Sequence, residues 1–174
     1  MDDLVPFASR DYLALLGLLL FSRGADFLST WVATPTLILE GNPLAKKLGW
    51  KWGLFANFAL CLGFALWPLP AIVISTSSVL VAARNFQQAW LMRSLGEEVY
   101  RAWHVARLQE ARISLYLLCL LGQTALTAFV GAGLIYFAQG HFVAVAIGIG
   151  IVAYAVTVAF YTLLSVWRIR RALG

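Results

Sequence analysis

The sequence predicts an all-α integral membrane protein, a single transmembrane domain over residues 1–174 built as a bundle of five transmembrane helices. Hydrophobic residues make up 61% of the chain and charged residues only 12%, against about 45–50% and about 25% in soluble domains. The apolar residues also fall in runs of about 20, the length that crosses a bilayer. The short connectors between the runs leave no room for a separate soluble domain.

Each predicted span is an apolar run bounded by a turn or by a charged segment. The five spans cover residues 12–37, 50–67, 71–90, 113–137 and 142–167. The prolines of the WPLP segment, residues 67–70, predict a tight uncharged turn between the second and third spans. An alternative arrangement has four spans and a re-entrant segment near WPLP.

Residues 92–110 predict an amphipathic helix between the third and fourth spans. Glu97 and Arg101 are four residues apart and can form an ion pair on its polar face. Such a helix lies on the lipid headgroups or extends the third span. Its apolar residues recur at helical spacing, at Met92, Leu95, Val99, Trp103 and Ala106.

The basic residues predict the orientation of the chain. Ten of the 13 Lys and Arg residues fall on the side shared by the first loop, the third loop and the C-terminus. The opposite side has only Arg10, beside the acidic N-terminal segment. Because cytoplasmic loops are enriched in Lys and Arg, we expect the N-terminus outside and the C-terminus in the cytoplasm of a prokaryotic inner membrane. The ten residues are Lys46, Lys47, Lys51, Arg93, Arg101, Arg107, Arg112, Arg168, Arg170 and Arg171.

The net charge of +5 is explained by these loops and does not indicate a nucleic-acid partner. The expected partners are the lipid bilayer and either further copies of the chain or a larger membrane complex.

Polar residues within the spans predict one layer nearer the cytoplasmic side. At about 1.5 Å per residue, Asp26 and the Arg84–Asn85 pair lie about 20 Å from the outer ends of their spans. Asn57 lies about 10 Å from the cytoplasmic end of its span, which is the same depth in a core of about 30 Å.

Arg23, Asp26 and Thr30 lie on one face of the first span, at positions i, i+3 and i+7. Since a charge facing lipid costs several kcal/mol, this face is expected to point into the bundle. Just beyond the span, Glu40 and Asn42 belong to a predicted turn that can face the same layer.

The segments DFLST, residues 26–30, and EGNP, residues 40–43, resemble a pattern in a family of small uncharacterised prokaryotic membrane proteins. In that family an Asp lies in the first span and E-x-N-P follows it. The resemblance covers roughly residues 20–60 and implies no particular activity, but it emphasises these positions. The corresponding residues are Asp26, Ser29, Thr30, Glu40, Asn42 and Pro43.

These observations predict that the protein binds or translocates a polar or anionic small molecule, or a lipid headgroup, at the intramembrane layer. Arg23 and Arg84 against Asp26 leave one surplus positive charge, which suits a phosphate or carboxylate group. The predicted binding residues are Arg23, Asp26, Thr30, Glu40, Asn42, Asn57, Arg84 and Asn85.

Two alternatives remain open. In the first, the protein is a non-catalytic accessory or scaffold subunit of a larger membrane complex, and Arg23–Asp26 or Asp26–Arg84 is a structural ion pair. Alternatively, the protein is an intramembrane enzyme acting on a lipid headgroup, with Asp26 or Glu40 as the base. Because no HExxH, GxSxG or paired Ser/His pattern is present, no catalytic residue, metal site or cofactor is predicted.

Overall fold

A computed structural model describes residues 4–171, which fold into α-helices joined by short connectors with no strand in that range. Residues 1–3, part of the acidic N-terminal segment, and residues 172–174 lie outside the described range. The predicted all-helical class is therefore confirmed. The helices are α1 (Arg10–Ala33), α2 (Pro43–Phe64), α3 (Pro68–Leu95), α4 (Glu97–Glu110), α5 (Ile113–Phe137) and α6 (Phe142–Arg171).

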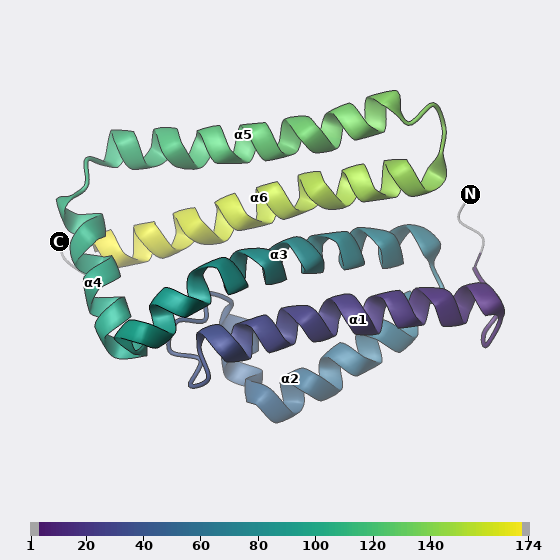
Figure 1. Cartoon of the computed structure of the whole chain (residues 1–174), viewed down its shortest axis with the longest axis horizontal. Helices are drawn as coiled ribbons and strands as arrows, with labels where there is room; N and C mark the ends of the chain where they lie inside the picture. Colours follow the sequence, from purple (N-terminus) through teal and green to yellow (C-terminus); the bar gives the residue numbers. More distant parts are fainter. Residues whose placement is uncertain (1–3, 172–174) are drawn as a thin grey trace.

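The long helices lie lengthwise beside one another (Figure 1). Helix α6 packs between α5 and α3, α3 also packs against α1, and α2 contacts both α1 and α3. Helix α4 crosses one end of the bundle, where the connector after α1 and the end of α6 also lie. The basic segments of α2, α4 and α6 therefore share one end, as the predicted alternation requires. The side of a membrane that this end faces stays a prediction.

Four of the described helices are long and apolar enough to cross a membrane, namely α1, α3, α5 and α6. They correspond to the predicted spans at residues 12–37, 71–90, 113–137 and 142–167, with ends that differ by at most about five residues. Large apolar side chains remain exposed along these helices, for example Phe129 on α5 at 76%. Such exposure on helices of this length is typical of surfaces that face lipid.

The second predicted span, residues 50–67, corresponds to the later part of α2 and is not among those four helices. Gly49 has φ 65° and ψ −171°, so it breaks the helix and leaves a regular segment over residues 50–64. At 1.5 Å per residue this segment is about 22 Å long, shorter than a bilayer core of about 30 Å. The count of five spans is not confirmed.

The amphipathic helix begins later than the predicted residue 92. Gly96 has φ 80°, a conformation that glycine adopts without a Cβ clash, and it separates α3 from α4. Residues 92–95 are therefore the last turn of α3. The cytoplasmic location of α4 stays a prediction.

Glycines set the close approach of α6 to its neighbours. A Cβ on Gly148 would lie 2.7 Å from the Gly131 carbonyl oxygen of α5. A Cβ on Gly150 would lie 2.7 Å from Cβ of Thr76 on α3. Ser77 of α3 also donates a hydrogen bond of 2.9 Å to the Gly150 carbonyl. Gly148 and Gly150 therefore lie on helix-packing surfaces of α6.

Candidate functional site

Helix α1 has an arginine and an aspartate one turn apart, and their side chains join three helices. Arg23 Nη1 donates to Asp26 Oδ2 at 2.9 Å and to Ser78 Oγ on α3 at 3.1 Å. Arg23 Nε donates to Asn57 Oδ1 on α2 at 2.8 Å, and Nη2 donates to the same oxygen. The side chains of Arg23 and Asp26 are only 28% and 17% exposed. We call these four residues the Arg23 cluster.

The sequence of α2 places Asn57 within reach of α1. Asn57 Nδ2 donates to the Gly53 carbonyl at 2.8 Å, which fixes the orientation of its amide. Gly53 is buried and faces the Phe27 ring of α1, from which a Cβ there would lie 3.6 Å away, an ordinary van der Waals contact. Trp50 packs edge-on against Phe27, with ring centroids 4.9 Å apart, and donates 2.8 Å to the Pro35 carbonyl. Helix α2 is thereby held against the second half of α1.

A second polar contact joins α1 to α3, one turn further along. Asn85 Nδ2 donates to Ser29 Oγ at 3.2 Å and to Thr30 Oγ1 at 3.3 Å. Ser29 is fully buried and donates 2.8 Å to the Asp26 carbonyl. The structure therefore brings Thr30 and Asn85 beside the Arg23 cluster, at the depth the sequence predicts.

The EGNP segment forms the turn that starts α2. Asn42 Oδ1 accepts from the Leu44 amide at 3.0 Å, which caps the helix. Glu40 Oε1 accepts from the Asn42 amide at 2.7 Å. The Glu40 carboxylate lies within electrostatic reach of Asp26. Glu40 therefore borders the Arg23 cluster, whereas Asn42 has the role of a helix cap.

Arg84 is separate from this layer. It makes no hydrogen bond or ion pair with any residue in the range 4–171, and Asp26 pairs with Arg23. Successive helix residues differ by about 100°, so Arg84 points to a different side of α3 from Asn85. Its guanidinium acts electrostatically on Tyr100 of α4 and Tyr116 of α5. The predicted single layer is therefore divided between two sides of α3.

Sequence reasoning missed the role of Glu97, which was expected to pair with Arg101. The carboxylate accepts from Thr34 Oγ1 at 2.5 Å, from Thr36 Oγ1 at 2.7 Å and from the Thr36 amide at 3.1 Å. Burial acts to raise the pKa of Glu97, but these hydrogen bonds together hold it below its usual value. The segment Thr34-Pro35-Thr36 has two hydroxyls beside a helix end. This pattern was the sequence signal for an acidic partner.

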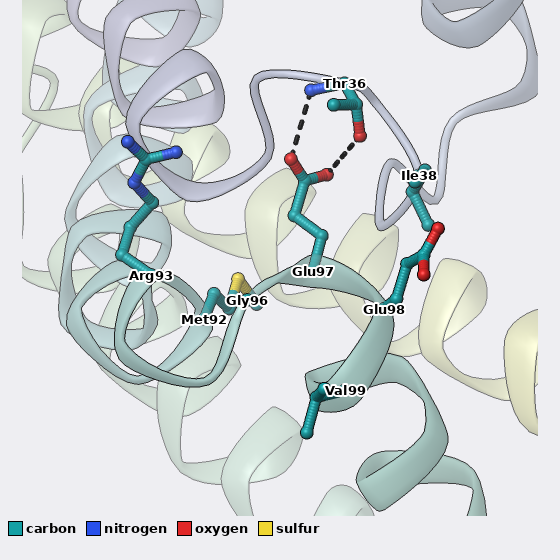
Figure 2. A pocket seen from close by; sticks show the side chains of 8 residues that line it. All are labelled: Thr36, Ile38, Met92, Arg93, Gly96, Glu97, Glu98 and Val99. Carbon is teal, nitrogen blue, oxygen red and sulfur yellow. Dashed lines mark hydrogen bonds between the residues drawn. The ribbon is translucent and has the colours of Figure 1, made fainter.

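Figure 2 shows the Glu97 contact in the wall of an open pocket of about 350 Å³. The pocket lies between the connector after α1 and the junction of α3 with α4. The contact joins α4 to the end of α1. Its lining residues are Thr36, Ile38, Met92, Arg93, Gly96, Glu97, Glu98 and Val99.

Metal-ligating residues do not cluster in the described part of the chain, where no group of three or more His, Cys, Asp and Glu side chains could hold an ion. His104 instead stacks on Tyr100, with an interplanar angle of 11°. Burial lowers the pKa of His104, so the neutral imidazole is favoured.

The chain is an α-helical protein with helices of membrane-spanning length and an internal polar layer. No family model, no curated protein and no solved structure matches it. The resemblance over residues 20–60 stays a prediction.

Proposed function

We propose that this protein binds a polar small molecule or a lipid headgroup beside Asp26 of the Arg23 cluster, between α1, α2 and the EGNP turn. One observation carries the proposal. Asp26 Oδ2 accepts from Arg23, while Asp26 Oδ1 has no hydrogen-bond partner within residues 4–171. The Asp26 side chain is only 17% exposed, yet Oδ1 itself is not fully buried, so a ligand can reach this oxygen and donate a hydrogen bond to it.

The charges around Asp26 favour a ligand that is cationic or donates hydrogen bonds. Without Arg84, the formal charges are +1 from Arg23 and −1 each from Asp26 and Glu40, which sum to −1. An ammonium or another hydrogen-bond donor suits this balance better than the anionic group that the sequence predicted. Translocation of such a ligand is part of the same proposal.

A thermal-shift titration of the purified protein in detergent tests the proposal. The probes are ethanolamine, choline, glycerol and inorganic phosphate. We expect ethanolamine or choline to raise the melting temperature of the wild type by several degrees, and Asp26→Asn to abolish that rise. The matched control is Asp11→Asn, an exposed aspartate at the start of the same helix. A response that persists in Asp26→Asn, or none from either amine in the wild type, contradicts the proposal.

A second candidate function is a non-catalytic scaffold, in which the Arg23 cluster is purely structural. The favouring observation is that Arg23 already uses four of its five N–H groups on protein acceptors. A scaffold predicts that Asp26→Asn lowers the melting temperature without changing any ligand response. The same titration therefore separates the two functions. The enzyme alternative gains no support, because the Ser78 hydroxyl of this cluster accepts from Arg23 and makes no hydrogen bond with Asp26 or Glu40 as a base.

A further inference from the structure

Arg84 is an unpaired cation in a membrane-spanning helix. It lies about 16 Å from the Leu95 end of α3, at 1.5 Å per residue, and is half-buried. Of the acidic residues in the described range, Asp26 and Glu110 pair with Arg23 and Arg107, and Glu97 is held by threonines. Because arginine stays charged at all relevant pH values, its five N–H donors require acceptors from outside the described protein atoms.

The surroundings of Arg84 supply hydrogen-bond donors and no carboxylate. Tyr100 on α4 is 9% exposed and stacks on His104. Tyr116 on α5 is half-buried and feels the charge of the same guanidinium. Gln87 and Gln88, three and four residues beyond Arg84, lie on the same face of α3 and are exposed. A guanidinium with phenols and amides around it matches an anion with several acceptor oxygens.

Helix α6 lies between α3, which carries Arg84, and α5, which carries Tyr116. Helix α3 and helix α5 both pack on α6 but make no close approach to each other. In Figure 1, α6 separates them and α4 crosses near their ends. The end of the bundle that α4 crosses is the basic end. There Arg170 Nη2 donates to the Leu108 carbonyl at 3.2 Å and so ties α6 to α4.

We propose that Arg84 binds a phosphate group, with the hydroxyls of Tyr100 and Tyr116 as further donors. The phosphate belongs either to a phospholipid headgroup at the α4 end of the bundle or to a free phosphate ion. This site is distinct from the proposed site beside Asp26. It binds an anion, whereas the site beside Asp26 is proposed to bind an ammonium or another hydrogen-bond donor. The two sites therefore fail or succeed independently.

The experiment uses the full chain in detergent micelles and measures melting temperature against three probes. Inorganic phosphate reports a free-ion site. Dioleoylphosphatidylglycerol in mixed micelles reports a lipid site, and dioleoylglycerol is its phosphate-free control. We expect phosphatidylglycerol or phosphate to stabilise the wild type, and dioleoylglycerol to have no effect. If neither phosphate probe stabilises the wild type, or if dioleoylglycerol stabilises it equally, the proposal is overturned.

Variants assign the effect to Arg84. Arg84→Gln should weaken the apparent affinity for the stabilising probe at least tenfold. Arg93→Gln, an exposed arginine on the same helix, should match the wild type. Without any probe, Arg84→Gln should melt at the wild-type temperature or above it, since removing it leaves no partner unpaired. A lower melting temperature, or an unchanged affinity, overturns the proposal.

Tyr100→Phe keeps the ring and removes only one hydroxyl, so it provides a second readout if Arg84→Gln fails to fold. We expect a threefold to tenfold weaker affinity for the stabilising probe in Tyr100→Phe. An affinity equal to that of the wild type in Tyr100→Phe excludes this hydroxyl from the site and overturns the proposal as stated.

Discussion

The two arginines within membrane-spanning helices of this protein have opposite surroundings. Arg23 donates to Asp26, Asn57 and Ser78, and so joins α1, α2 and α3. Arg84 lies on the neighbouring helix α3 and has no hydrogen bond within residues 4–171. The difference shows that the position of a charge along a helix of membrane-spanning length does not by itself determine its role. A saturated guanidinium stabilises the helix assembly, whereas one without acceptors retains its capacity to bind an anion.

Replacing the two arginines in turn should give the largest contrast. Arg23→Gln leaves Asp26 as a largely buried charge without its partner, which typically costs about 3–5 kcal/mol. For a chain of this size that corresponds to a fall of about 10 °C in melting temperature. Differential scanning fluorimetry in detergent measures the fall, and Arg84→Gln is the matched variant. Equal destabilisation by both substitutions would remove the distinction between the two sites.

Gly150→Ala should separate the two sides of α3. The added Cβ would lie 2.7 Å from Cβ of Thr76, so α3 and α6 must move apart, at a cost of about 1–3 kcal/mol. Because α6 holds α5 and therefore Tyr116, phosphate binding at Arg84 should weaken while the amine response at Asp26 stays. The control is Gly133→Ala, where nothing lies within 4 Å of the new Cβ. Unchanged phosphate binding in a destabilised Gly150→Ala protein would contradict the role of α5.

Glu97→Gln tests whether α4 is held in place independently of either arginine. The substitution keeps the size of the side chain but weakens charge-assisted hydrogen bonds from Thr34 and Thr36, at a cost of about 1–2 kcal/mol. Amide hydrogen exchange should increase in residues 34–38 and at the start of α4. Glu98→Gln, on the adjacent exposed residue, is the control. Identical exchange in both variants would show that the contact does not hold α4.

The smallest expected effect is a pH dependence of the melting temperature that arises from His104, which stacks on Tyr100. Burial depresses the pKa of His104 in the folded protein. The folded state therefore resists protonation, and stability is complete above the unfolded value of about 6.5 and declines as the pH falls below it. His104→Gln should flatten the profile of melting temperature between pH 7 and pH 5. An equally steep decline in this variant would assign the dependence to other groups.

Much of the architecture follows from apolar run length and turn chemistry. The predicted span over residues 113–137 matches α5, because a tight turn and a basic segment bound it on either side. Whether residues 50–67 form a further span could not be decided from the sequence. Gly49 lies in a basic segment, and nothing in the sequence around it indicates its positive φ or the contacts of the adjacent Trp50 with Phe27 and Pro35.

For the candidate site, the sequence predicted the positions of the residues along their helices but not the directions in which their side chains point. Depth along a helix follows from a fixed rise, which correctly placed Arg23, Asp26 and Asn57 together. Direction around the helix changes by about 100° per residue, so Arg84 and Asn85 face different neighbours although they are adjacent. The partners Ser78 and Glu97 escaped prediction for the same reason, because hydrogen bonds across 55 and 63 residues depend on the final packing.

The Arg23 cluster also has a consequence for membrane insertion during synthesis. The partners Asn57 and Ser78 lie 34 and 55 residues further along the chain than Arg23. When α1 first leaves the ribosome, Asp26 is the partner that enters the lipid with it. The nascent helix therefore crosses as an internally neutralised pair, whose remaining donors wait for α2 and α3. We expect an interval during insertion in which the Arg23 donors that later contact Asn57 and Ser78 have no protein acceptor.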